Sequence, residues 1–307
     1  MRFLMILAFS LLLPNAAPAA SFDRTRSCEP ALLAMTYNIR LDTQADGDNS
    51  WAKRKHLLFG QIVTMRPHIL GLQEVLPNQQ DDLKAVLADY DFIGAGRDDG
   101  KYAGEASPLI IDRKMFKIET SGTFWLSPTP NVPSLGWDAA YKRVATWAHL
   151  TRRSDKAKLL VINSHWDHLG LIARQKSGAQ ILEWISRNRI AGEQVILLGD
   201  FNADDTEESV AQLSREISGH AMLMNTRAAA AERNFGPAIS FNAFNPFPTS
   251  GKLIDHIFVS PGISVRAQGV VAQHENGRVP SDHFPVVALL DFPSSRKFTG
   301  CRMTRKN

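Results

Sequence analysis

The amino-acid sequence predicts an α/β protein with large β-sheets. Short apolar runs typical of buried strands alternate with amphipathic stretches over nearly the whole chain. The chain has 307 residues, of which 44% are hydrophobic, and this is enough for a substantial core. It contains no fixed repeat, low-complexity tract or obvious linker, so we expect one compact domain rather than two.

Each predicted element follows from its local pattern. Apolar runs bounded by turn formers predict the strands, and apolar residues at helical spacing predict the helices. Loops as long as those between them usually shape a binding site in a compact domain. The predicted strands cover residues 31–38, 68–74, 91–96, 107–112, 145–150, 158–166, 194–201, 255–260 and 284–290, the helices cover 52–66 and 173–189, and the long loops cover 41–52, 97–107, 120–142 and 225–250.

The first 19 residues have the features of a secretory signal peptide. They contain one arginine, an apolar run of about a dozen residues and a small-residue end, "APA", which predicts cleavage before Ala20. The run is too short to span a bilayer, although a retained membrane anchor is the alternative. We therefore expect an exported protein, periplasmic or extracellular, whose mature domain covers 20–307 without a transmembrane segment.

Two cysteines, Cys28 and Cys301, lie near opposite ends of the predicted mature chain. An exported protein meets oxidising surroundings, so we expect a disulfide between them, with two unpaired thiols as the alternative. Neither cysteine has partners at the spacing of a zinc site.

The charge of the mature chain favours no particular class of partner. Removal of residues 1–19 takes away one arginine, which leaves 34 basic and 31 acidic residues and a formal charge of +3. Much of the excess lies in the tail 294–307, "SSRKFTGCRMTRKN", which has the composition of a solvated end.

Polar residues stand repeatedly at the ends of the predicted buried strands. Side chains at i and i+2 on an extended chain share one face, so Asp200 with Asn202, and His165 with Asp167, can each act together. Taken singly, each could be an ordinary turn former or helix cap. Their joint occurrence predicts a shared polar site at the sheet rim, where α/β proteins bind ligands.

Carboxylates within this set predict a metal site. Glu74 and Asp282, with the amide oxygen of Asn38, offer the hard oxygen ligands that Mg²⁺ prefers, and Mn²⁺ or Ca²⁺ could substitute. His165 and His283 lack the local spacing of a zinc site, which makes zinc the weaker interpretation.

Six ordered motifs together resemble the endonuclease/exonuclease/phosphatase superfamily, and the resemblance covers roughly residues 31–291. It is closest to the exported bacterial branch, in which stretches like "GEASPLIIDR" and "FWLSPTP…GWDAAYKRVATW" also occur. It implies the DNase I-like fold, a four-layer α/β sandwich of two packed mixed sheets flanked by helices. The motifs are "TYNIR" (36–40), "LQE" (72–74), "NSHWDH" (163–168), "GDFN" (199–202), "IDHIFVS" (254–260) and "SDHFPV" (281–286).

The resemblance also implies roles for eight of the polar motif residues. Asp167 and His168 match no role in it. Because Asp282 and His283 are consecutive, they should diverge, one toward the metal and the other toward the phosphoryl group. By this resemblance Glu74 binds Mg²⁺, Asn38 and Asp282 lie against the metal and its water shell, Asp200 orients or deprotonates the attacking water, Asn202 and His165 contact the phosphate, His283 contacts a phosphoryl oxygen, and Asp255 holds the His283 imidazole.

These residues predict an exported, Mg²⁺-dependent phosphoesterase in which water attacks a phosphate ester, a phosphodiester first. A secreted nuclease acting on DNA or RNA is one alternative, although Arg40 stands where abasic-site endonucleases carry an acidic residue and no loop suited to gripping duplex DNA is evident. A sphingomyelinase-like lipid phosphodiesterase is another, with the apolar loop "FNAFNPFPTS" (241–250) as its candidate membrane contact. A non-catalytic binding protein is disfavoured, because such a protein would usually have lost some of the residues Glu74, Asp200, Asn202, Asp282 and His283, and all are present. We expect a monomer.

Overall fold

The computed structural model describes residues 31–217, 220–230 and 233–292, which all belong to one compact unit. The predicted signal peptide, the two cysteines and the basic tail lie outside the described residues, so the predictions made for them stay predictions. Among the described residues, no helix combines the length and the apolar character needed to cross a membrane.

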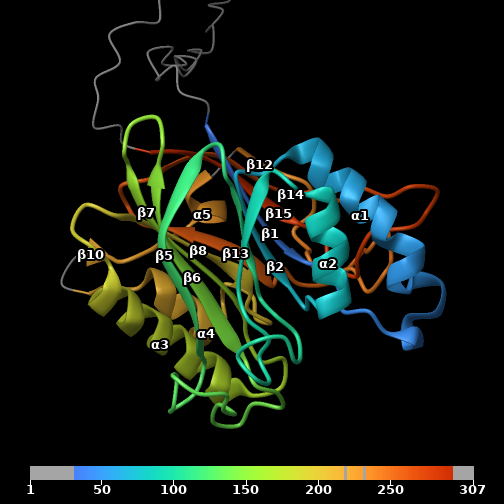
Figure 1. The fold of residues 1–307 in the computed structure, drawn as a ribbon, viewed down its shortest axis with the longest axis horizontal. Coiled ribbons are helices and arrows are strands. Elements are labelled where there is room, and N and C mark those ends of the chain that lie inside the picture. The colour runs from blue at the N-terminus through green and yellow to red at the C-terminus, as the bar shows by residue number, and fades with distance from the viewer. Residues whose placement is uncertain (1–30, 218–219, 231–232, 293–307) are drawn as a thin grey trace, which may run out of the picture. The chain divides into compact units, whose positions relative to one another are not determined.

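Two mixed β-sheets form the centre of the described chain (Figure 1). Most neighbouring strands are antiparallel, whereas β1–β2, β12–β14 and β7–β8 are parallel. The first sheet has the order β12 (Asn234–Phe235), β14 (Ser264–Val270), β15 (Val286–Asp291), β1 (Leu32–Asn38), β2 (Ile69–Gln73), β4 (Leu109–Asp112) and β3 (Tyr90–Ile93). The second has the order β11 (Met224–Asn225), β13 (Asp255–Val259), β8 (Gln194–Asp200), β7 (Lys158–His165), β6 (Val144–Arg152) and β5 (Phe116–Trp125), and β9 (Glu216–Ile217) pairs separately with β10 (His220–Ala221).

Helices cover the outer faces of both sheets. In Figure 1, α1 (Trp51–Met65) and α2 (Pro77–Val86) lie on one side of the sheets, and α3 (Leu171–Asn188) with α4 (Glu208–Ala211) lies on the other. This arrangement confirms the predicted α/β class with two mixed sheets and flanking helices. The remaining short helices are η1 (Gln44–Asn49), η2 (Gln212–Ser214) and α5 (Thr226–Ala230).

The alternation of side chains along each strand explains the layers. In β1, Ala34 faces the core between the sheets, whereas its neighbour Met35 joins the core under α1 and α2. In β8, Ile196 likewise faces the core between the two sheets, whereas Leu197 packs under α3 against Ile181. Strands that are buried on both faces consist of continuous apolar runs in the sequence, which is why they could be predicted well.

Three longer elements were not predicted. The segment 120–142 was expected to be irregular, but β5 runs through its first six residues as the edge strand of its sheet, with several exposed polar side chains that hide the strand pattern. Strand β14 alternates exposed and buried residues in its first half and has no apolar run. Helix α2 buries only Gln79 and Leu83, so its apolar face is too narrow to recognise, although Pro77 at its first turn is a typical start signal.

Candidate active site

Both sheets contribute strand ends to one polar cavity of about 570 Å³. Strands β13 and β15 run antiparallel to β8 and β1, so their starting ends meet the carboxyl ends of these neighbours. Asp255 and His165 both lie opposite Asp200 in the strand register. The cavity is lined by six of the predicted site residues, Glu74, His165, Asp200, Asn202, Asp282 and His283, and the other two, Asn38 and Asp255, are fully buried in contact with them.

Asn38 connects the two sheets at this edge. Its amide nitrogen donates hydrogen bonds of 2.9 Å to Glu74 Oε1 and of 2.9 Å to Asp200 Oδ2, across the sandwich. Its amide oxygen accepts the backbone N–H of Arg40 at 3.0 Å. The side chain thus turns its nitrogen toward the two carboxylates and positions them, and the expectation that its oxygen lies against a metal stays a prediction.

Glu74 and Asp282 form a pair of largely buried carboxylates that fits a divalent cation. Glu74 follows β2 with a φ of 61°, and its Oε2 accepts the backbone N–H of Leu41 at 3.0 Å. Arg40 approaches Glu74 at 4.0 Å and Asp282 at 3.9 Å, too far for hydrogen bonds. Burial, and after it the negative charge of Glu74, raises the pKa of Asp282 against the opposing charge of His283. Carboxylate oxygens are the ligands that Mg²⁺ prefers, so Glu74 and Asp282 are the residues here that could hold it.

His283 and Asp282 diverge as expected. Whereas Asp282 faces Arg40, the Nδ1 atom of His283 lies 2.8 Å from Asp255 Oδ2, and its Nε2 lies 3.8 Å from Asp200 Oδ2. Burial lowers the pKa of His283, but the charges of Asp255 and Asp200 outweigh burial and raise it to about 10. The imidazole therefore carries a proton at neutral pH and is a strong hydrogen-bond donor.

The ligand atoms of Asp200, Asp255 and His283 lie within 4.8 Å of one another, so this buried group could also hold a metal ion. The imidazolium between the two carboxylates, however, already compensates one of their two negative charges. Burial and the charge of Asp255 raise the pKa of Asp200, with His283 opposing them. A carboxylate with a raised pKa is a better proton acceptor, so this group fits proton transfer better than it fits metal binding.

His165 is uncharged in this environment. Burial, and then the charges of Arg143 and Arg97, holds its pKa well below the ordinary value. The amide nitrogen of Asn202 donates to the Trp166 carbonyl at 2.9 Å and lies 3.0 Å from His165 Nε2. Since that nitrogen is a donor, Nε2 accepts and the imidazole proton resides on Nδ1. Any hydrogen bond from His165 to a phosphoryl oxygen would therefore come from Nδ1.

Arg54, which the sequence analysis did not single out, organises the backbone around these ligands. Its fully buried guanidinium donates to the carbonyls of Ile39 and Arg40 at 2.6 Å each, of Asn49 at 2.8 Å and of Pro280 at 2.9 Å. It thus fixes both the loop after β1 and the approach to Asp282. A signal was present in the sequence, because this arginine falls on the apolar stripe of its helix.

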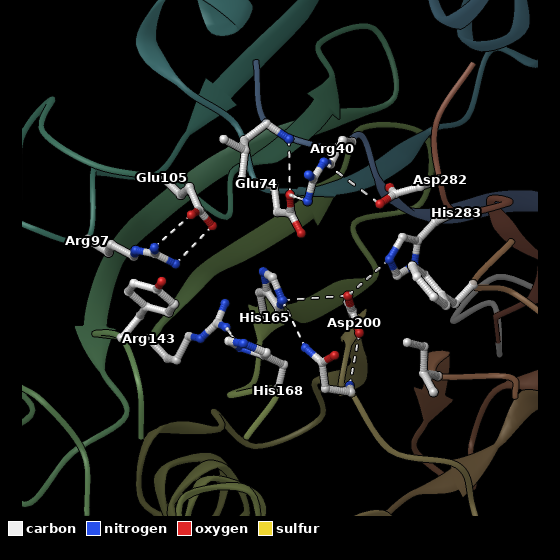
Figure 2. Close-up of a pocket in the computed structure, with 15 residues that line it drawn as sticks. Arg40, Glu74, Arg97, Glu105, Arg143, His165, His168, Asp200, Asp282 and His283 are labelled. Atoms are coloured by element: carbon white, nitrogen blue, oxygen red, sulfur yellow. Dashed lines mark hydrogen bonds and ion pairs between the residues drawn. The ribbon is translucent and has the colours of Figure 1, made fainter. Parts of the chain in front are cut away.

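Further cavity residues come from segments whose motifs had no assigned role. "GEASPLIIDR" supplies Glu105, and "GWDAAYKRVATW" supplies Tyr141 and Arg143. Asp167, also without a predicted role, accepts the Nε–H of Arg143 at 3.3 Å and the backbone N–H of Gly170 at 2.8 Å. Figure 2 shows Arg143 beside His168, on the side of the cavity away from Asp282.

The fold and the site together define a class of protein. The fold is a two-sheet sandwich, and its strand ends bring carboxylates, an amide and two imidazoles into one cavity. The model of the endonuclease/exonuclease/phosphatase family matches residues 35–283, and the chain belongs to this family.

Three known proteins are similar to this chain over most of its length. A solved Bacteroides vulgatus family member is 35% identical, with a TM-score of 0.80 over 86% of this chain and 100% of that one. A mannosyl-6-phosphatase of Bacteroides thetaiotaomicron, Bt3783, is 33% identical, with a TM-score of 0.78 over 85% of this chain and 100% of that one. The uncharacterized protein L388 of Acanthamoeba polyphaga mimivirus is 24% identical over 81% of this chain and 95% of its own length.

Proposed function

We propose that this chain is an exported, Mg²⁺-dependent phosphoric ester hydrolase that acts as a monomer. The observation that carries the proposal is the hydrogen-bonded link from Glu74 through Asn38 to Asp200, with both bonds at 2.9 Å. It holds a candidate metal ligand and a candidate base at a fixed separation, on rigid strand ends. Positioning of this kind is the main requirement of phosphate ester hydrolysis.

Each residue then has a chemical task. Asp200 accepts a proton from the attacking water, which its raised pKa favours. His283 donates to a phosphoryl oxygen, where negative charge grows in the transition state. Neutral His165 orients the phosphoryl group, and Asn202, whose amide N–H groups point to His165 and to the Trp166 carbonyl, holds that imidazole. A direct contact of Asn202 with the phosphate stays a prediction. Glu74 and Asp282 would hold Mg²⁺, which when bound supplies charge neutralisation for the phosphoryl and leaving-group oxygens.

Two kinds of ester should be compared. The sequence motifs favour a phosphodiester, whereas the 33% identical mannosyl-6-phosphatase supports a monoester on a sugar.

The lipid alternative requires an apolar contact surface, and the loop 241–250 offers only part of one. Phe241 and Phe247 are exposed, but Phe244 packs onto the core and Phe241 lies edge-on to His283 in the cavity wall.

The test is a substrate panel at increasing Mg²⁺ concentration. The panel should contain mannose 6-phosphate, p-nitrophenyl phosphate, bis-p-nitrophenyl phosphate, sphingomyelin and DNA. We expect hydrolysis of at least one small ester, no activity in excess chelator, and a raised Mg²⁺ requirement for Glu74→Gln. Full activity in chelator, or hydrolysis of no ester in the panel, would contradict the proposal, and exclusive cleavage of DNA would select the nuclease alternative. Amino-terminal sequencing of the exported protein tests the predicted cleavage before Ala20. Light scattering tests whether the protein is a monomer.

A further inference from the structure

The cavity extends beyond the groups that the proposed hydrolysis uses. Its volume of about 570 Å³ is within the range of sites that enclose a whole small molecule, about 300–1,000 Å³, rather than a phosphoryl group alone. Five of the remaining lining residues form what we call the distal arm. The distal arm consists of Arg97, Glu105, Tyr141, Arg143 and His168.

The distal arm lies where the alcohol half of the ester must lie. Displacement at phosphorus brings the attacking water and the leaving oxygen into line on opposite sides. Figure 2 shows Asp200 on one side of the cavity and the Arg97–Glu105 pair on the other, with His165 between them. A water beside Asp200 therefore directs the leaving group toward the distal arm.

The charges of the distal arm are already balanced. Arg97 Nη1 donates to Glu105 Oε2 at 2.9 Å, and its Nη2 lies 2.6 Å from Oε1 of the same carboxylate. Arg143 pairs with Asp167 at 3.3 Å. Each cation thus has its own carboxylate. A second phosphate or carboxylate on the substrate would lie against Glu105 and Asp167 as well as against the arginines, so the arrangement favours an uncharged group.

Hydrogen-bonding capacity nevertheless remains in the arm. Arg143 is only 5% exposed, and among the described residues its Nη1 has no hydrogen-bond partner. Its Nη2 lies 3.2 Å from His168 Nδ1. A buried guanidinium nitrogen without an acceptor is costly, so it marks a place for an acceptor oxygen from a ligand. A hydroxyl group can accept from Arg143 and also donate to a carboxylate such as Glu105.

Tyr141 supplies an aromatic wall to the same region. The Arg97 guanidinium lies 5.1 Å from its ring centroid, and the His168 ring stacks on it at 5.9 Å. These contacts fix the ring, which is still 53% exposed. A fixed aromatic surface beside paired donors and acceptors suits a ligand with both C–H surface and hydroxyl groups.

We propose that the distal arm is the binding subsite for the leaving alcohol, and that this alcohol is a neutral polyhydroxylated molecule such as a hexose. Arg143 Nη1 donates to one of its hydroxyl oxygens, the Glu105 carboxylate accepts from a hydroxyl, and Tyr141 contacts its C–H surface. The assignment rests on the proposed hydrolysis at the neighbouring groups, and it names the substrate class as sugar or polyol phosphates.

The kinetic test compares two esters of the same phosphoryl group. Mannose 6-phosphate carries hydroxyl groups on its alcohol, and butyl phosphate carries none. We expect Arg143→Met and Glu105→Gln each to lower kcat/KM for mannose 6-phosphate by about 10- to 100-fold, because each removes a hydrogen bond to a charged group. For butyl phosphate, the loss in kcat/KM should be at least about fivefold smaller, because only the effect of Arg143 on the charge of His165 is common to both esters. An equal loss on both esters would overturn the assignment.

A matched control separates recognition from loss of an ion pair. Asp155 forms a buried bidentate pair with Arg152, at 2.8 and 2.5 Å, at the opposite end of β6 from Arg143. Asp155→Asn should lower the melting temperature without changing the preference between the two esters. If it changed the preference as much as Glu105→Gln does, the effect would be structural and the subsite would be wrong.

A binding measurement distinguishes failure of the subsite from failure of the proposed hydrolysis. Saturation-transfer NMR with methyl mannoside should show contact with the wild-type protein and loss of contact in Glu105→Gln. Such a result without hydrolysis of any ester would support the subsite and refute the hydrolase. Hydrolysis with no preference for mannose 6-phosphate and no methyl mannoside contact would refute the subsite and leave the hydrolase in place.

Discussion

Replacing Asp255 by asparagine should move the alkaline limit of activity toward neutral pH. Asp255 lies 2.8 Å from His283 Nδ1, and after the opposing effect of burial its charge is the main cause that raises the His283 pKa to about 10. Loss of an opposite charge at this distance lowers a pKa by about 1–3 units. With a change of about 2 units, roughly one molecule in ten keeps the proton at pH 9. Asparagine keeps one oxygen to accept the Nδ1–H bond, so the ring stays oriented.

The assay is kcat from pH 5.5 to 9.5, at saturating Mg²⁺ and with one ester throughout. Asp255→Asn should keep most of its activity near pH 6 and lose about tenfold at pH 9 relative to wild type. Glu193→Gln is the matched control, because Glu193 is a buried carboxylate 2.7 Å from His149 and lies outside the cavity. An unchanged alkaline limit in Asp255→Asn, or an equal shift in the control, would refute the reasoning.

Three further predictions test other parts of the molecule. Asp282→Asn should lose activity that high Mg²⁺ partly restores, whereas His283→Ala should lose about a hundredfold in kcat with no restoration, because it removes a donor to the transition state; rescue of His283→Ala by Mg²⁺ would contradict the division of roles. Although burial opposes it, backbone N–H groups hold the pKa of Asp167 at about 2, below its ordinary 3.8, so its contribution is present above pH 3.8 and is lost as the pH falls toward 2. Urea unfolding should therefore show Asp167→Asn less stable by about 2 kcal/mol at pH 7, and the difference should shrink below pH 4; a difference independent of pH would exclude this linkage. Intact mass after alkylation without reduction should show no labelled Cys28 or Cys301, and two labels on native protein would end the disulfide prediction.

The sequence predicted the fold where burial leaves a strong pattern. Central strands such as β1 and β8 are apolar on both faces, so their ranges were found within one residue at each end. The edge strand β5 and helix α2 contact the core through few side chains, and composition alone does not distinguish them from loops. Their existence depends on neighbouring elements that they cover, which a local pattern does not reveal.

Some residues of the candidate site could likewise be predicted from the sequence, and others could not. Glu74, Asp200 and His283 could be named because chemically active residues at strand ends stand out from an apolar background. The part played by Arg143 depends on which of its nitrogens lacks a partner, and only the folded structure shows this. Arg54 lies on the apolar stripe of its helix, which was a signal of burial, but the carbonyl groups that it binds come from segments distant in the sequence and only the folded structure shows them.

The position of β15 in the sheet means that the site cannot exist until nearly the whole domain has been synthesised. β15 pairs with β1 at the centre of the first sheet, and Ser281, 243 residues after Asn38, donates a hydrogen bond to the Asn38 carbonyl. A nascent chain that lacks this segment has neither Asp282 nor His283, and its first strand has an unpaired edge. Hydrolytic activity should therefore appear in one step as synthesis of the domain is completed, and shortened translation products should be inert.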